Sequence, residues 1–237
     1  MNEENYKKGL MVFSSDGEVQ EVQKAKEGVK RSLPSIGVTY RDGVVLASCT
    51  ERDKSVLLRE DNLSSVFMIS DRVGMVSSGR VADSQALADD MRDKAMEDIE
   101  MYGKVEDVNL LAREVSEDVR EATQTLVNRP YGVSLLVGGL NGNEKSSLFK
   151  ISVDGSMSSW DACAIGENSE DMIDHMESRY NRTQDRDDAL QLALTTILSF
   201  SDADSQSLSV SLVAESGFEE MNKSEVDELI TEVINNE

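Results

Sequence analysis

The chain has 237 residues, 39% of them hydrophobic, so it is long enough to bury one sizeable core. Its 46 acidic and 24 basic residues give a net charge of 24 − 46 = −22, which argues against nucleic acid or an anionic membrane as partner. Two cysteines, Cys49 and Cys163, and one histidine, His175, exclude a disulfide framework and a histidine-rich metal site. We therefore expect two small buried thiols, a surface imidazole, no metal and no cofactor.

The N-terminus predicts neither secretion nor membrane insertion. Its apolar stretch is too short for a signal peptide, and nowhere do about 18 consecutive apolar residues occur. No linker interrupts the periodic segments, so we expect a single cytoplasmic domain over residues 1–237. The acidic residues recur along the predicted helices, which predicts a solvated acidic surface. Such a surface belongs either to an ordinary acidic protein or to a salt-rich cytoplasm, where repulsion is screened within about 3 Å at 1 M salt.

The first half of the chain predicts a short helix, two hairpins and two long helices. Residues 18–31 place valines at helical spacing. The β-rich runs SIGVTY and VVLASCT are separated by Arg41-Asp42-Gly43, an Asp-Gly hairpin signature, and VFMIS and GMVSS are joined through Asp71-Arg72. Two apolar stripes at helical spacing then predict helices over residues 81–102 and 105–126. The stripes consist of Leu87, Met91, Ala95 and Ile99, and of Val108, Leu111, Val115 and Val119.

The second half predicts a three-stranded meander from Arg129 to Trp160, and then helices over residues 168–180 and 186–200. The run GVSLLVGG is apolar over much of its length, which is typical of a strand covered on both faces. One more strand, LSVSLVA, and a final helix, SEVDELITEVI, complete the chain. Ser224, with Asp227 three residues later, predicts the capping box of that helix.

This order of elements indicates an α+β fold. Roughly eight strands joined mostly by short hairpins favour two antiparallel sheets, and two helix pairs then cover them in a four-layer sandwich. Trp160 is expected to pack in the core. Met91 and Met96 are also expected to fill core space, although methionines on helices can instead line a partner groove.

Several stretches in this order resemble the α-type subunits of the proteasome core particle of archaea. They extend from about Tyr6 to Ile230, and five in register are more specific than any one alone. The stretches are Phe13-Ser14-Ser15-Asp16-Gly17, Ser35-Ile36-Gly37-Val38 with Asp42-Gly43-Val44-Val45-Leu46-Ala47, Ser78-Gly79-Arg80-Val81-Ala82-Asp83, Arg129-Pro130-Tyr131-Gly132-Val133-Ser134-Leu135, and Ala164-Ile165-Gly166. The resemblance implies the αββα sandwich of N-terminal-nucleophile hydrolases, over residues 35–230.

The resemblance also implies where an active relative would carry its catalytic groups. Such enzymes need a Thr, Ser or Cys whose own freed amine acts as the base, because an ordinary hydroxyl is a weak nucleophile. Here the nucleophile position falls on Leu33, the aspartate position on Cys49 and the position of the assisting lysine on Ser65. Ser35 is a nearby hydroxyl, but the sequence shows no base for it. The resemblance therefore implies a catalytically inactive subunit of a threonine-protease complex.

Alpha-type subunits form seven-membered rings that cap the proteolytic beta rings, support their assembly and restrict substrate entry. The implied partners are other alpha subunits, beta subunits and a regulatory ATPase, with no nucleic acid and no membrane. Residues 1–12 would form the gate segment, and the helix over residues 18–31 would seal against a neighbour near the ring face. The gate departs from the family pattern, because the usual Tyr-Asp-Arg reads Tyr6-Lys7-Lys8, the turn proline is Ser15 and the helix tyrosine is Lys24.

The pocket that receives the C-terminal carboxylate of an activating ATPase also departs from the pattern. Ser65 stands where the family has a lysine, and a serine offers a hydrogen bond without a charge. Gly79 of that pocket remains, and Arg80 replaces a small or apolar residue, so Arg80 could supply the missing cation. A divergent alpha-type subunit with these departures could use other activators, mix with another alpha subunit, or form a ring that has no ATPase partner.

Two alternatives stay open. An active hydrolase of the same fold would require cleavage before a Ser, Thr or Cys, so a purified protein that retains Met1 or Asn2 argues against it. A stand-alone binding protein that reuses the sandwich would be monomeric or would form a different oligomer.

Overall fold

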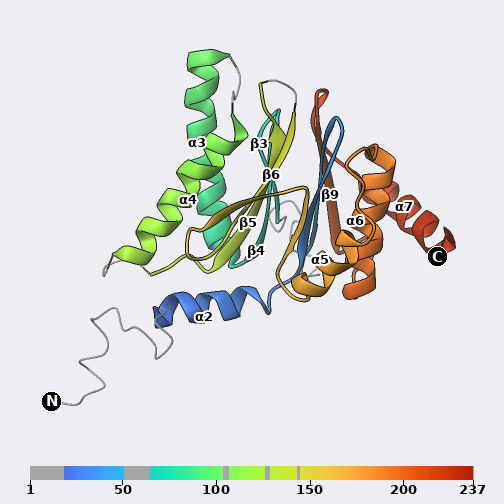
Figure 1. The fold of residues 1–237 in the computed structure, drawn as a ribbon, viewed down its shortest axis with the longest axis horizontal. Helices are drawn as coiled ribbons and strands as arrows, with labels where there is room; N and C mark the ends of the chain where they lie inside the picture. Colours follow the sequence, from blue (N-terminus) through green and yellow to red (C-terminus); the bar gives the residue numbers. More distant parts are fainter. Residues whose placement is uncertain (1–18, 51–64, 104–106, 126–128, 143–144, 237) are drawn as a thin grey trace, which may run out of the picture.

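The computed structural model describes residues 19–50, 65–103, 107–125, 129–142 and 145–236. Within them, two five-stranded antiparallel sheets lie face to face between two sets of helices (Figure 1). This four-layer arrangement confirms the predicted αββα sandwich. The elements in chain order are α2 (Gln20–Val29), β1 (Ser35–Tyr40), β2 (Gly43–Cys49), β3 (Val66–Ser70), β4 (Val73–Gly79), α3 (Val81–Tyr102), α4 (Val108–Gln124), β5 (Val133–Leu140), β6 (Ser146–Ile151), β7 (Met157–Trp160), β8 (Ala162–Ile165), α5 (Ser169–Glu177), α6 (Arg186–Phe200), β9 (Leu208–Ala214), β10 (Gly217–Glu220) and α7 (Lys223–Asn236).

The two sheets have different strand orders and different helical covers. One sheet has the order β3-β4-β5-β6-β7 and packs against α3 and α4. The other has the order β10-β9-β2-β1-β8 and packs against α5 and α6, with α7 further out (Figure 1). Helix α2 runs across one end of the sandwich, beneath the end of β4 (Figure 1).

Three apolar clusters hold these layers together. Leu87 and Val115 belong to the cluster between α3, α4 and their sheet, and Leu136 belongs to the cluster between the two sheets. Val45 and Leu194 belong to the third, between the other sheet and its helices. All five side chains are almost fully removed from water, and burial of apolar surface is the main favourable term in folding. The apolar stripes in the sequence correspond to these buried faces.

Most of the predicted elements are confirmed. The helices expected over residues 81–102 and 186–200 have those bounds in α3 and α6, and the strand expected from LSVSLVA is β9. The three-stranded meander consists of β5, β6 and β7, and every residue of β5 is buried, as its apolar sequence predicted. The first expected helix, over residues 18–31, is shorter and begins at Gln20.

The strand count differs from the prediction, because the described residues form ten strands where the sequence indicated roughly eight. The first missed strand, β8, follows Asp161, contains Ala164 and Ile165, and pairs with β1 in the other sheet. It has four residues, too few for a periodicity to show. The second missed strand, β10, is an edge strand that contains two glutamates and pairs with β9. Polar edge strands carry a weak sequence signal.

The first hairpin is present, but Gly43 does not lie in its turn, although the Asp-Gly signature suggests that it does. Gly43 pairs with Tyr40 as the first residue of β2, so Arg41 and Asp42 form the loop. Among the described residues that are not glycine, Asn168 alone has a positive φ, so the loop is not the type I′ turn that Asp-Gly favours. A Cβ on Gly43 would lie 2.4 Å from the Tyr40 hydroxyl and from the Val213 carbonyl oxygen. The glycine is therefore required for close packing.

The capping box predicted for the last helix is wrong by two residues. The Asn222 side chain accepts hydrogen bonds from the backbone N–H groups of Ser224 and Glu225, both at 3.0 Å. The Glu225 carboxylate in turn accepts the Asn222 N–H at 2.8 Å. Asn222 and Glu225 thus form the reciprocal pair, in place of Ser224 and Asp227.

The expectations for individual side chains are met in part. Cys49 and Cys163 are buried as predicted, and burial raises the pKa of each thiol to about 11. His175 is not a simple surface imidazole, because it is half-buried and its Nδ1 lies 2.9 Å from the Thr196 hydroxyl. Met96 is 59% exposed, contrary to the expectation of a core position.

The other three expectations concern apolar packing. Met91 lies in the core, and Trp160 packs at the edge of the cluster between the sheets. Ile99, the last residue of the α3 stripe, is exposed. The helical stripe therefore loses contact with the sheet towards the end of α3.

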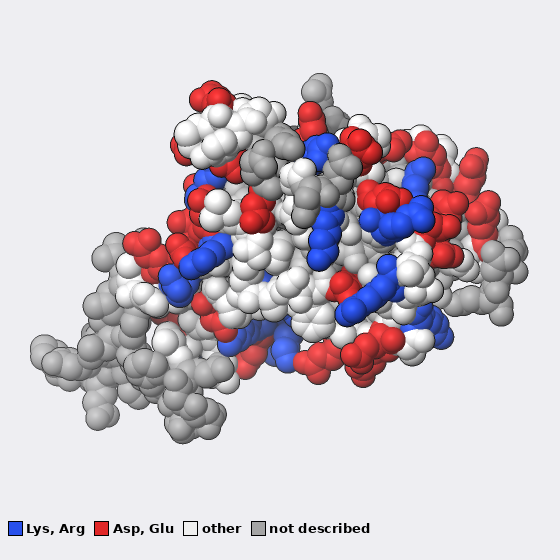
Figure 2. Space-filling view, turned by 45° about the horizontal axis from the view of Figure 1, so that its top comes forward, with Lys and Arg blue, Asp and Glu red and all other residues white. Residues whose placement is uncertain are grey.

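The acidic residues recur along the chain and do not gather in one segment. Figure 2 shows acidic side chains spread over the visible face, with basic side chains among them. No helix within the described ranges is both long and apolar enough to cross a membrane. The same part of the chain has no group of three or more His, Cys, Asp or Glu side chains that could hold a metal ion.

Candidate functional site

The segment that leads into β1 is held in place by hydrogen bonds to its backbone carbonyl groups. The Leu33 carbonyl accepts a hydrogen bond from the Ser78 hydroxyl at 2.7 Å. On either side, the Ser32 carbonyl accepts the Glu167 N–H at 2.9 Å, and the Pro34 carbonyl accepts the Cys49 N–H at 3.0 Å. The nitrogen of Leu33 is part of the peptide bond to Ser32, so it is an amide and not a free amine. A backbone amide cannot act as the base of an N-terminal nucleophile.

Two of the three positions that the sequence matched to catalytic groups lie together. Leu33 and Cys49 both line a hollow of about 690 Å³, which is also bordered by Phe200 and Ser201. Burial raises the pKa of the Cys49 thiol to about 11, so the thiol is protonated at neutral pH and is a poor nucleophile. Its hydrogen-bond contact is the Ser201 hydroxyl at 3.7 Å, which is no general base.

Ser65, the third position, has a structural role. It immediately precedes β3, is half-buried, and its carbonyl accepts the Ser77 N–H at 3.0 Å. It does not belong to the described lining of the hollow that contains Leu33 and Cys49. The structure therefore brings two of the three matched positions together and leaves Ser65 outside.

Ser35 does not have the surroundings of a nucleophile. Its side chain is fully buried, 2.7 Å from the Ser48 hydroxyl, and it donates to the Ser77 carbonyl at 2.8 Å. Hydroxyl and carbonyl groups do not remove a proton from serine at neutral pH, so these contacts offer no general base. The Ser35 hydroxyl satisfies buried polar groups between strands, as its position at the start of a strand suggested.

Gly79 and Arg80 form the corner between β4 and α3. Gly79 has a φ of +135°, and a Cβ there would lie 2.2 Å from the Gly132 carbonyl oxygen. The Arg80 N–H donates to that same carbonyl at 2.9 Å. A Cβ on Gly132 would in turn lie 2.9 Å from Arg80 Cδ, so the stem of the exposed Arg80 side chain passes close to Gly132. Two glycines thus allow the arginine to cross this corner.

A buried carboxylate fixes the same corner. Asp83 accepts hydrogen bonds from Arg129 Nη1 at 2.7 Å and Nη2 at 2.5 Å, and from the Gly132 N–H at 2.8 Å. The Asp83 side chain is 5% exposed and that of Arg129 is 56% exposed. The hydrogen bonds from Arg129 lower the pKa of Asp83 against the opposing effect of burial. We call these three residues the Asp83 clamp.

Sequence reasoning did not assign the Asp83 clamp. Asp83 and Arg129 both lay within stretches that carried the family resemblance, but nothing in the sequence paired them. The available signal was an aspartate in the first turn of an apolar-striped helix, on the side that becomes buried. An acid at such a position requires a partner.

Helix α2 rests on the sandwich through a small contact of its own. Val22 and Val29 pack with Val153, and Lys26 Nζ lies 2.9 Å from Asp154 Oδ2. Although burial opposes ionisation, hydrogen bonds from Ser156 and Lys26 hold the pKa of Asp154 at about 2. Lys24, the one predicted gate residue within the described ranges, is exposed on this helix. The predicted gate residues Tyr6, Lys7, Lys8 and Ser15 lie outside the described residues.

Exposed apolar side chains gather at one end of the helix pair α3 and α4. Of the nine large apolar side chains that are exposed among the described residues, five lie near the end of α3 or the start of α4. These five residues, which we call the apolar tip, are Met96, Ile99, Met101, Tyr102 and Leu110. Contiguous exposed apolar surface on a soluble protein commonly marks an interaction site.

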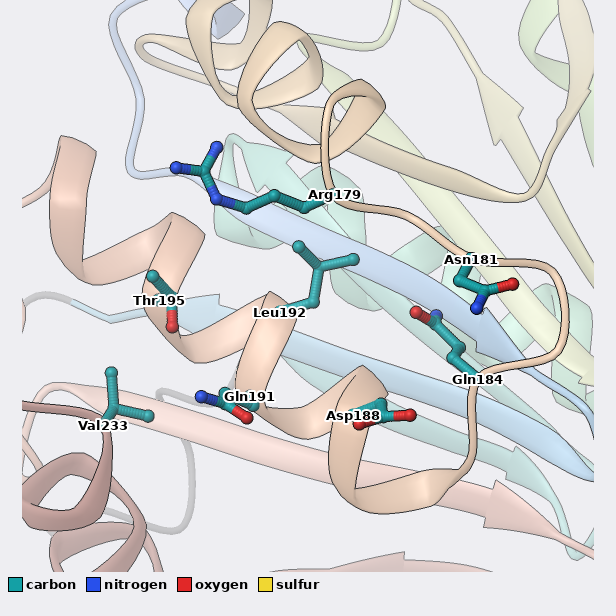
Figure 3. Close-up of a pocket in the computed structure, with 8 residues that line it drawn as sticks. All are labelled: Arg179, Asn181, Gln184, Asp188, Gln191, Leu192, Thr195 and Val233. Atoms are coloured by element: carbon teal, nitrogen blue, oxygen red, sulfur yellow. The ribbon is translucent and has the colours of Figure 1, made fainter. Parts of the chain in front are cut away.

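A second hollow, of about 460 Å³, lies beside α6 between α7 and the loop that follows α5 (Figure 3). Its lining mixes charged, amide and apolar side chains, and none of the predicted site residues contributes to it. The buried Gln184 serves the fold, because its Nε2 donates to the Thr39 carbonyl at 2.8 Å. Asn181 likewise accepts hydrogen bonds from Thr183 within its own loop. These contacts hold the loop to β1 and assemble no catalytic pair.

Comparison with known proteins identifies the fold family. A family model described as "Proteasome subunit" matches residues 29–216. Proteasome subunit alpha 1 of Haloarcula marismortui is 35% identical over 83% of this chain and 75% of its own length. Proteasome subunit alpha 2 of Haloferax volcanii is 32% identical over 96% of this chain and 91% of its own length. Proteasome subunit alpha of Halobacterium salinarum is 35% identical over 81% of this chain and 75% of its own length. The chain therefore belongs to the proteasome subunit family, and the three relatives named here are alpha subunits of halophilic archaea.

Proposed function

We propose that the chain is a non-catalytic alpha-type subunit of the proteasome core particle, which forms the outer ring and controls substrate entry to the proteolytic beta rings. The observation that carries the proposal is the residue two positions before β1. Leu33 has neither a nucleophilic side chain nor a free amine. Its carbonyl oxygen accepts a hydrogen bond from the Ser78 hydroxyl. An active member of the fold needs both groups at this position.

The proposed partners are other alpha subunits, beta subunits and a regulatory ATPase, in the cytoplasm. Two surfaces support assembly. The apolar tip exposes apolar side chains at one end of the helix pair, where a partner subunit would remove them from water. Helix α2 has its own small contact with the sandwich, so its outer side is free to meet a neighbour. A head-to-tail interface that closes after a fixed rotation generates a ring, for which seven members are proposed here.

The proposed domain organisation follows from this role. Residues 1–12 are the gate segment, residues 18–31 the N-terminal helix and residues 35–230 the sandwich, within one domain over residues 1–237. The proposed gate residues are Tyr6, Lys7, Lys8, Ser15 and Lys24. A gate segment rich in Asn, Glu and Lys has little to anchor it alone.

The proposed activator pocket contains Ser65, Gly79 and Arg80. The carbonyl of Ser65 is already used by Ser77, and its side chain offers no charge to a carboxylate. Arg80 is exposed at the start of α3, where the helix dipole also favours an anion. We therefore assign to Arg80 the capture of the activator's C-terminal carboxylate.

Arg80→Ala should weaken this capture about tenfold, because a charge-assisted hydrogen bond is lost. The measurement is the fluorescence anisotropy of a labelled neutral hexaglutamine peptide with a free C-terminus, titrated with the assembled protein. Arg113→Ala, which removes an exposed arginine from α4, is the matched control and should leave the affinity unchanged. If the Arg80→Ala protein and the original protein bound the peptide with equal affinity, Arg80 would not contribute to the pocket.

The function itself is tested by expressing the chain alone and together with an archaeal proteasome beta subunit. We expect the chain alone to hydrolyse no fluorogenic peptide, and the co-purified complex to hydrolyse it with a Ser35→Ala subunit as well as with the original one. Hydrolysis by the chain alone that Ser35→Ala abolishes would establish an active hydrolase instead. A chain that never co-purifies with beta subunits, and stays inactive, would point to a stand-alone binding protein.

A further inference from the structure

Basic residues concentrate at the end of α2. Residues 24–31, with the sequence KAKEGVKR, contain four of the 24 basic residues of the chain and one acidic residue, a local charge of 4 − 1 = +3. The whole chain carries −22. This short stretch therefore has the opposite sign to the protein as a whole.

Part of this basic charge is not neutralised by other residues in the described part of the chain. Lys26 pairs with Asp154 at 2.9 Å, and Lys30 lies 3.3 Å from Glu170. Lys24 and Arg31 are both exposed, and neither forms an ion pair with any residue in the described part of the chain. Glu27 lies between them along the helix and is also exposed, so it reduces the local charge without removing it.

Arg80 extends the same basic surface. The Ser32 and Ser78 hydroxyls lie 3.4 Å apart, and the Ser78 hydroxyl donates to the Leu33 carbonyl at 2.7 Å. These contacts bring the end of α2 beside the end of β4, two residues before Arg80. Figure 1 shows α2 passing beneath that end of β4. Arg80 is exposed and forms no direct ion pair with the described residues, although its charge helps to lower the pKa of Asp83.

These residues come from neighbouring segments. Lys24 lies on α2, and Arg31 lies in the turn that follows Val29, the last residue of the helix. The contact between Ser32, next to Arg31, and Ser78 brings that turn near Arg80. We call Lys24, Arg31 and Arg80 the basic strip.

We infer that the basic strip binds an acidic segment of a partner protein through the side-chain carboxylates of that segment. The chain as a whole carries a charge of −22, which repels such a partner, so the strip determines where it docks. In molar salt, charges separated by more than about 3 Å are screened, so attraction requires direct contact, which guanidinium groups make with carboxylates in a fixed geometry. This inference rests on the proposed docking at Arg80 and extends it from a terminal carboxylate to side-chain carboxylates.

The test uses a labelled hexaglutamate peptide whose C-terminus is amidated, titrated with the full chain in molar KCl. Lys24→Gln combined with Arg31→Gln should weaken binding about tenfold, as expected for the loss of two exposed charge contacts. Arg41→Gln combined with Arg182→Gln makes the same change in net charge at exposed arginines away from the strip, and should leave binding unchanged. Equal weakening by both pairs, or no binding to the original protein, would overturn the inference. Tighter binding of a single-stranded RNA hexamer at the same residues would overturn it too.

The neutral hexaglutamine peptide with a free C-terminus separates this inference from the docking proposal. If that peptide binds through Arg80 and amidated hexaglutamate does not bind, the pocket for a terminal carboxylate stands and the basic strip fails. If amidated hexaglutamate binds through Lys24 and Arg31 while the neutral peptide does not bind, the basic strip stands and the capture of a terminal carboxylate by Arg80 fails.

Discussion

Asp83→Asn should lower the free energy of unfolding by about 2 kcal/mol at neutral pH, because it removes the charge from a buried group that accepts three hydrogen bonds. The full cost of breaking a buried ion pair is larger, but Arg129 is more than half exposed and can turn to water. Equilibrium unfolding by urea in molar KCl measures the change. Asp93→Asn, at an exposed position of the same helix, is the matched control and should change stability by less than about 0.5 kcal/mol.

The same substitution has an expected pH dependence. The folded-state pKa of Asp83 lies below its ordinary value of 3.8, chiefly because of the hydrogen bonds from Arg129. The ionised carboxylate therefore contributes stability above the unfolded-state pKa, and this contribution is lost as the pH falls through the lowered folded-state pKa. The difference between Asp83→Asn and the original protein should be constant near neutral pH and shrink below pH 3.8. A difference that grew on acidification would contradict the Asp83 clamp.

Gly79→Ala should cost about 3 kcal/mol or more, because two penalties coincide. The φ of +135° is one that L side chains rarely adopt, and the added Cβ would lie 2.2 Å from the Gly132 carbonyl and 2.8 Å from Val133 Cα. Both contacts are with backbone, so relief requires β4 and β5 to separate at the end that bears Arg80. Thermal unfolding followed by circular dichroism is the measurement.

Gly28→Ala is the control for the general effect of adding a methyl group to a glycine. It lies in α2, and a Cβ there would meet no atom within 4 Å. Alanine should therefore stabilise the protein slightly, by about 0.5 kcal/mol, by favouring the helix and restricting the unfolded chain. If Gly79→Ala were as harmless as Gly28→Ala, the close approach between β4 and Gly132 would be wrong.

The parts of the fold that the sequence predicted are those where a periodic apolar pattern is long. Leu87 and Met91 on α3 recur at helical spacing and are buried, and β5 is apolar because both of its faces are covered. Five stretches in the right order also carried the family resemblance. A pattern fails to predict an element that is short, as in β8, and it fails to predict burial where a helix extends beyond the sheet, as at Ile99.

The candidate site was predicted in its positions but not in its contacts. The sequence indicated that Leu33 stands where a nucleophile would be, and the structure adds that its carbonyl is bonded to Ser78. The Asp83 clamp joins residues 46 positions apart, and no local rule selects Arg129 over another arginine as the partner. Which residue serves as the cap of α7 was equally undecidable from spacing alone, since Asn222 and Ser224 both start acceptable capping boxes.

Absolute mass by light scattering in molar KCl tests the proposed ring most directly, because it depends on neither a substrate nor an activator. We expect a particle of seven or fourteen times the 26.1 kDa of one chain. A particle of 26.1 kDa at the same salt concentration would contradict a ring built from this chain.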